Sequence, residues 1–165
     1  MIALRVVAAA ASLAVTVAAA EGAVYTVRQL SPETALKAAQ AALAKCRAQG
    51  YQVSVAVVDR AGLTQAFLRD RFAGPHTVDF AANKAWTAVS FRSHTRDLER
   101  LTRPGEPMSG LRNTPRFIAI GGGMMIEAGG SLLGGIGVSG APGGDADHAC
   151  AAAGIEAVAE EIELQ

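Results

Sequence analysis

The sequence has no net charge, few aromatic residues and only two cysteines, and each scarcity narrows the possible functions. Its 165 residues carry 15 basic and 15 acidic side chains, so no basic excess predicts binding to nucleic acid phosphates. Aromatic residues make up 5% of the chain, which also disfavours stacking of nucleic acid bases. Because half of the residues are hydrophobic, the chain can bury the core of one small domain. We therefore expect a globular domain with no nucleic acid partner.

The two cysteines, Cys46 and Cys150, have no cluster of histidines beside them, which excludes a zinc site of the usual spacing. Cys46 falls on the apolar face of a predicted helix, and Cys150 falls to the side of another such face. This placement favours two small thiols that are buried or half-buried. A disulfide is the alternative, and it is chemically permitted if the protein is exported.

Long hydrophobic runs are absent except at the N-terminus. Arg5 precedes an apolar run from Val6 to Ala18, and the alanines at 18–20 form an A-x-A cleavage site before Glu21. This order predicts a secretory signal peptide at residues 1–20. The alternative, a membrane anchor, fits less well because the run is short and rich in alanine. We expect a periplasmic or secreted protein with a single domain at 21–165 and no membrane segment after cleavage.

The remaining sequence predicts alternating helices and hairpins. Ser31, Pro32 and Glu33 are typical of a helix start, and Gly50 is typical of its end. The further elements expected are strands 51–59 and 63–69, helices 77–91 and 94–101, strands 117–120, 124–128 and 131–139, and a last helix capped by Asp145. Consecutive hairpins imply an antiparallel five-stranded sheet of the α+β class, in the order αββα(α)βββα.

The helix at 77–91 has two distinct faces. Small apolar residues are spaced to lie flat on a sheet, and they are Val78, Ala82, Ala85 and Val89. Side chains able to contact a ligand share another stripe, and they are His76, Phe80, Asn83 and Thr87, with Lys84 on the next row. An imidazole, an aromatic ring, an amide, a hydroxyl and an ammonium along one face suit a cleft with a polar rim.

Three of the charged or ionisable residues here have specific candidate roles. Arg69, at the end of the second predicted strand, and Lys84 can hold a carboxylate. His76 can ligate iron through a neutral imidazole nitrogen, or it can simply be a helix-capping or surface residue. Lys84 stands among alanines, so its side chain either reaches toward the solvent or is held in a site.

Glycines at 121–123 would let the backbone approach a ligand closely, although a plain hairpin or bulge explains them equally well. Met124 is better explained as an apolar wall or core filler than as a metal ligand. Residues 135–140 match the pattern G-x-G-x-x-G, but they lie inside the last predicted strand. A dinucleotide site needs those glycines between a strand and a helix, so this function is excluded.

Three segments in order resemble the GlcG/HbpS haem-binding family. They are VAVVDRAGLTQAFLRD (55–70), AANKAWTAVSF (81–91) and the glycine-rich stretch at 120–155. The resemblance implies a profilin-like sheet flanked by helices, a homo-oligomer, and haem as the ligand. The sequence departs from the common pattern at Met124 and Met125, where a small residue and proline are usual, and at His148, near the start of the last helix.

We therefore expect an exported protein that binds a small molecule or cofactor, with haem first among the candidates. The expected ligand-binding residues are Arg69, His76, Phe80, Asn83, Lys84, Gly121, Gly122, Gly123 and Met124, with His76 as the metal ligand. The sequence lacks a complete catalytic constellation, which ranks binding above catalysis. The alternatives are an enzyme that clamps a small hydroxy or oxo acid between Arg69 and Lys84 with His76 as general acid–base, and an accessory subunit of a periplasmic redox system.

Overall fold

The structure, a computed structural model, describes residues 22–164, so the predicted signal peptide at 1–20 lies outside the described residues. The elements are α1 (Pro32–Ala48), β1 (Ser54–Asp59), β2 (Thr64–Arg69), α2 (His76–Phe91), α3 (Thr95–Leu101), the 3-10 helix η1 (Ser109–Asn113), β3 (Gly123–Ala128), β4 (Ser131–Ser139) and α4 (Gly144–Glu163). Within this part of the chain, no helix combines the length and the apolar character needed to cross a bilayer.

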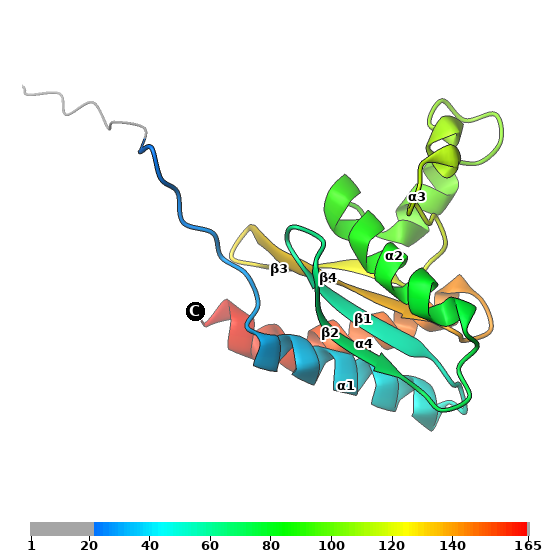
Figure 1. The fold of residues 1–165 in the computed structure, drawn as a ribbon, viewed down its shortest axis with the longest axis horizontal. Coiled ribbons are helices and arrows are strands. Elements are labelled where there is room, and N and C mark those ends of the chain that lie inside the picture. Colours follow the sequence, from blue (N-terminus) through cyan, green and yellow to red (C-terminus); the bar gives the residue numbers. More distant parts are fainter. Residues whose placement is uncertain (1–21, 165) are drawn as a thin grey trace, which may run out of the picture.

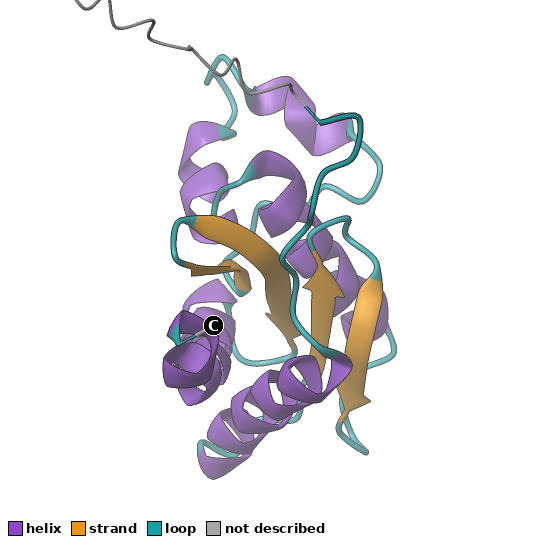
Figure 2. Cartoon of the chain, turned by 90° about the vertical axis from the view of Figure 1, so that its left-hand side faces the viewer, coloured by secondary structure: helices purple, strands orange, loops and turns teal. Residues whose placement is uncertain are grey.

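The four strands form one sheet in the order β2-β1-β4-β3, and all three pairings are antiparallel. Helices α1 and α4 pack together on one face of the sheet, while α2 crosses the opposite face (Figures 1 and 2). The α+β class and the antiparallel sheet are therefore confirmed. The loop from β4 to α4 lies at the same end of the sheet as the start of α2 (Figure 1), and this placement creates the site described below.

The predicted fifth strand, at 117–120, is wrong, because the sheet has four strands and this segment is a loop. Phe117 and Ala119 are buried against Leu98 of α3 instead of pairing with the sheet. The backbone N–H of Ile118 donates to the hydroxyl of Thr87 on α2 at 3.0 Å. Alternating apolar residues thus serve here to pack an extended loop beneath a helix.

Helix α1 begins and ends as the sequence predicts. The N–H of Thr34 donates to the Ser31 hydroxyl at 3.1 Å, and Pro32 occupies the first turn. Gly50, with φ of +81°, follows the helix in the left-handed conformation that favours glycine. The main core lies between the sheet and helices α1 and α4, and it includes Val55 and Val57 of β1.

Helix α2 approaches the sheet closely because β4 carries glycines beneath it. A Cβ atom built on Gly137 would lie 2.0 Å from the carbonyl oxygen of Ala81. The buried face of α2 includes Ala81, Lys84 and Ala88, whereas Val78 and Ala82 of the predicted face are only half-buried. The predicted face was therefore partly wrong, because the buried side of the helix is turned toward Ala81 and Lys84.

Helix α4 does not use Asp145 as its cap. Its N-cap is Gly143, with φ of +92° and no side-chain capping bond, and Asp145 lies in the first turn. The carboxylate of Asp145 pairs with Arg96, whose Nε donates to it at 3.0 Å. The prediction failed because it took the acidic residue near the helix start as the cap and overlooked Gly143, whose turn already begins the helix.

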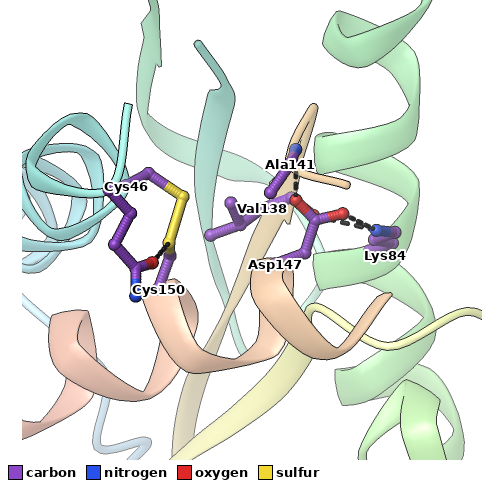
Figure 3. Close-up of a disulfide and its surroundings, with 7 residues drawn as sticks. Cys46, Lys84, Val138, Ala141, Asp147 and Cys150 are labelled. Atoms are coloured by element: carbon purple, nitrogen blue, oxygen red, sulfur yellow. Dashed lines mark hydrogen bonds and ion pairs between the residues drawn. A yellow bond between two sulfur atoms is a disulfide. The ribbon is translucent and has the colours of Figure 1, made fainter. Parts of the chain in front are cut away.

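A disulfide joins Cys46 of α1 to Cys150 of α4, and both cysteines are fully buried (Figure 3). The expectation of two free thiols is thus wrong. The two residues are 104 positions apart, and they meet because α1 and α4 pack side by side. Helical periodicity located each cysteine near an apolar face, but only the tertiary packing brings those faces together.

Candidate functional site

A cleft of about 490 Å³ opens at one end of the sheet. The first turns of α2 form one wall, and the loop between β4 and α4, residues 139–144, forms another. Apolar side chains on the cleft include Tyr51, Phe72, Phe80 and Ile120, of which Phe72 is 79% exposed. An open site with several aromatic and aliphatic walls suits a flat, largely apolar ligand.

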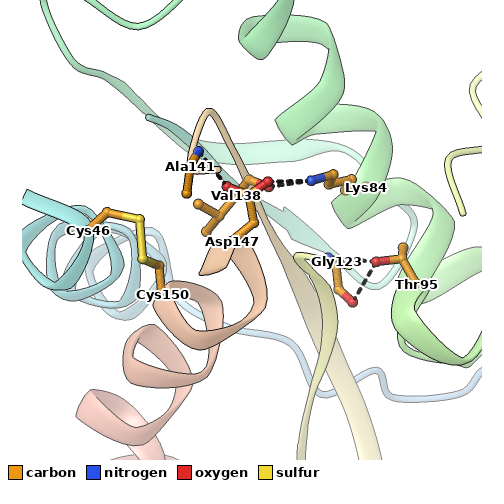
Figure 4. Close-up of polar contacts among 8 residues, drawn as sticks. All are labelled: Cys46, Lys84, Thr95, Gly123, Val138, Ala141, Asp147 and Cys150. Atoms are coloured by element: carbon orange, nitrogen blue, oxygen red, sulfur yellow. Dashed lines mark hydrogen bonds and ion pairs between the residues drawn. A yellow bond between two sulfur atoms is a disulfide. The ribbon is translucent and has the colours of Figure 1, made fainter. Parts of the chain in front are cut away.

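Lys84 and Asp147 both line this cleft and form a buried ion pair with each other. Figures 3 and 4 show the pair. Lys84 Nζ donates to Asp147 Oδ2 at 2.7 Å and to the carbonyl oxygen of Val138 at 3.0 Å. The other carboxylate oxygen of Asp147 accepts the N–H of Ala141 at 2.9 Å. The pair therefore connects α2, the end of β4 and the first turn of α4.

Burial dominates the electrostatics of this pair, because Lys84 is only 1% exposed and Asp147 only 4%. The loss of hydration lowers the pKa of the Lys84 ammonium and raises the pKa of the Asp147 carboxyl. In both cases the attraction of the opposite charge works against this shift. Each charge thus depends on its partner for most of its stabilisation.

The glycines at 121–123 make room for this pair and for the neighbouring helices. A Cβ atom on Gly122 would lie 2.7 Å from Asp147 Cβ and 3.0 Å from Lys84 Nζ. The N–H of Gly123 donates to the Thr95 hydroxyl at 2.8 Å (Figure 4). These contacts explain the glycines by close packing. None of the three lines the cleft, and Met124 packs against the main core.

His76 and Phe80 are brought together at the rim of the cleft, one turn apart on α2. Their rings meet edge to face, with centroids 5.8 Å apart. His76 is exposed, and its imidazole makes no hydrogen bond with any other residue in the range 22–164. Both ring nitrogens are therefore available to a ligand.

The other predicted ligand-binding side chains are engaged elsewhere. Arg69 donates to the carbonyl oxygen of Ala73 at 2.6 Å and does not line the cleft. Asn83 accepts a hydrogen bond from Arg116 at 3.2 Å, also outside the cleft. Since Lys84 is paired with Asp147, the structure does not bring Arg69 and Lys84 together as a clamp for a small acid.

Sequence reasoning missed Asp147 as the partner of Lys84, and it missed the cleft walls at Tyr51, Phe72 and Ile120. The one available signal was Lys84 itself, because a lysine among alanines needs a partner if it is buried. Within residues 22–164, no group of three or more His, Cys, Asp or Glu side chains could hold a metal ion. A single imidazole is what this cleft offers to a metal.

Comparisons with known proteins point to one family. A family model described as "Haem degrading protein HbpS-like" matches residues 30–156. The crystal structure of a double mutant of Streptomyces reticuli HbpS is 40% identical, with a TM-score of 0.77, and the match covers 87% of this chain and 96% of that chain. A crystal structure of a PduOC:heme complex is 29% identical, with a TM-score of 0.74, and the match covers 78% of this chain and 94% of that chain.

One curated relative is much longer than this chain. The corrinoid adenosyltransferase PduO of Salmonella typhimurium is 36% identical over 98 residues. The matched region is 57% of this chain but only 29% of that protein. The similarity therefore concerns a part of the adenosyltransferase.

Proposed function

The chain belongs to the family of haem degrading proteins described as HbpS-like, and from this premise we propose that it is an exported protein that binds haem in the cleft at the start of α2. The observation that carries the proposal is His76, whose imidazole has no hydrogen-bond partner among residues 22–164 and lies at the rim of a cleft with aromatic and aliphatic walls. The similarity to a PduOC:heme complex supports the same ligand.

The residues of the cleft fit a haem group. His76 would hold the iron through a neutral imidazole nitrogen, which needs no other protein ligand because the macrocycle supplies four. Phe72, Phe80 and Ile120 would cover apolar parts of the macrocycle. When bound, haem supplies the iron chemistry, and the protein sets its access and orientation. The Lys84–Asp147 pair would act as a brace that keeps the two walls of the cleft at a fixed separation.

The disulfide supports the export part of the proposal, because structural disulfides persist in oxidising compartments. Export would deliver the protein to the periplasm or the medium, where it would carry, sense or sequester haem. We propose that it does so as a homo-oligomer, which light scattering on the purified protein would test.

A titration of the purified protein with haemin, followed in the Soret region, tests haem binding. We expect a saturable band at one haem per chain, and we expect His76→Ala to weaken binding and shift the Soret maximum. His94→Gln is the matched control, because His94 is absent from the cleft walls and glutamine can still accept the N–H of Met125. A flat titration, or identical spectra and affinities for His76→Ala and the control, would refute this proposal.

A further inference from the structure

A second hollow of about 310 Å³ adjoins the cleft. The two share Ile120 and Gly144 as lining residues, so they lie next to each other. The residues that line the second hollow are Arg96, Glu99, Arg100, Arg103, Ile120, Gly144 and Asp145. Three arginines and two acidic residues thus lie beside the cleft.

The arginines of this hollow differ in how they are engaged. Arg96 is neutralised by its ion pair with Asp145. Arg100 and Arg103 are exposed, and neither guanidinium group forms a hydrogen bond or an ion pair with any residue in the described part of the chain. Glu99 is the only other acidic side chain that lines the hollow. Two guanidinium groups are therefore available to an anion.

The cleft itself offers no such group. The one lysine or arginine among its lining residues is Lys84, which is buried and already donates to Asp147 and to Val138. If a ligand carried carboxylates and these pointed into the cleft, they would meet apolar side chains and two buried charges that already pair with each other. Desolvating a carboxylate without a partner is costly, so its acid groups are better placed toward Arg100 and Arg103.

We propose that Arg100 and Arg103 bind the carboxylates of the cleft ligand and thereby select flat apolar molecules that carry acid groups along one edge. This inference rests on the proposed function, and it orients the ligand with its acidic edge toward α3 and its body against Phe80 and Ile120. Arginine suits this task because its planar fork matches a carboxylate. Since both arginines are exposed, the contribution of each pair to affinity is modest and sensitive to salt.

The test compares haemin with haemin dimethyl ester, which has the same macrocycle without ionised carboxylates. Both are titrated against the wild-type protein, the double variant Arg100→Gln/Arg103→Gln, and the control Arg60→Gln. Arg60 is an exposed arginine in the turn between β1 and β2 and lines neither hollow. Because all three positions are on the surface, we expect every variant to fold normally, with unchanged thermal unfolding.

We expect the double variant to lose roughly tenfold in affinity for haemin and to keep the wild-type affinity for the ester. Added salt should weaken the binding of haemin to wild type more than to the double variant. Equal losses for haemin and ester, or no loss for either, would overturn the inference and leave haem binding intact. Failure of wild type to bind either compound would overturn the proposed function, and this inference with it.

Discussion

Lys84 and Asp147 place two opposite charges where almost no water reaches them. Removing one partner would leave the other as an uncompensated buried charge, so Lys84→Met should destabilise the protein by about 3–5 kcal/mol. The double variant Lys84→Met/Asp147→Asn should recover a large part of that loss, because it removes both charges and keeps an acceptor for Ala141. Urea unfolding measures both values. A double variant that is no more stable than Lys84→Met would contradict this account.

His148 makes a second, pH-dependent contribution at the residue scale. Burial, together with the nearby Arg96 and His94, lowers the pKa of His148, and its Nδ1 is buried with no hydrogen-bond partner among residues 22–164. The unfolded chain therefore binds more protons than the folded protein in the pH range between the lowered folded pKa and the usual histidine pKa of about 6.5. As the pH falls from about 6.5 toward the folded pKa, His148 thus lowers the free energy of unfolding. Below the folded pKa of His148, this residue causes no further loss of stability.

When the pH is lowered from about 7.5 to about 5.0, we expect the Tm of His148→Gln to fall by less than the Tm of wild type. Thermal unfolding at the two pH values provides the measurement. His76→Gln is a useful control, because His76 is exposed at the cleft rim. The same drop in Tm for wild type and His148→Gln would show that burial of His148 has no effect on acid stability.

The sequence identified several residues of the cleft but not their partners. His76, Phe80 and Lys84 follow from their spacing on one helix, which is local information. Asp147 pairs with Lys84 across 63 positions, and that contact depends on how α4 docks against the sheet. The assignment of Arg69 to the cleft failed for a related reason, since the loop after β2 provides the carbonyl oxygen of Ala73 as a nearer acceptor.

Helix α2 depends on the glycines of β4 at the scale of whole elements. Gly137→Ala would place a methyl group against the carbonyl of Ala81 and the N–H of Ala85, both of which belong to the backbone and cannot move aside alone. We expect a loss of stability of at least about 1–3 kcal/mol as α2 is displaced. Chemical denaturation tests this, with Gly110→Ala as the control, since a Cβ atom there meets nothing within 4 Å.

Displacement of α2 should also disturb the cleft, because His76 and Phe80 lie on that helix. A Gly137→Ala protein as stable as the Gly110→Ala control would show that the sheet and helix can separate without cost. The start and end of α1 were predictable from Ser31, Pro32 and Gly50. The strand at 117–120 was not, because a short alternating segment can pack under a helix as well as in a sheet.

The disulfide acts on the whole molecule, because it closes a loop that contains every strand of the sheet. Cys46→Ala/Cys150→Ala should lower the free energy of unfolding by about 2–5 kcal/mol, since the unfolded chain regains the freedom that the bond removes. Because both cysteines are fully buried, we also expect reductant to act on wild type only after it is partly unfolded. Labelling with iodoacetamide in the presence of reductant, with and without urea, measures this protection. Rapid labelling in reductant without urea would contradict it.

The same bond determines how the protein would respond to mechanical force. If the two ends of the domain were pulled apart, tension would run along α1 to Cys46, cross directly to Cys150, and leave along α4. Only the segments outside the bond could be drawn out. The sheet, helix α2 and both hollows lie within the covalent loop, so they would carry no load until the sulfur–sulfur bond itself broke.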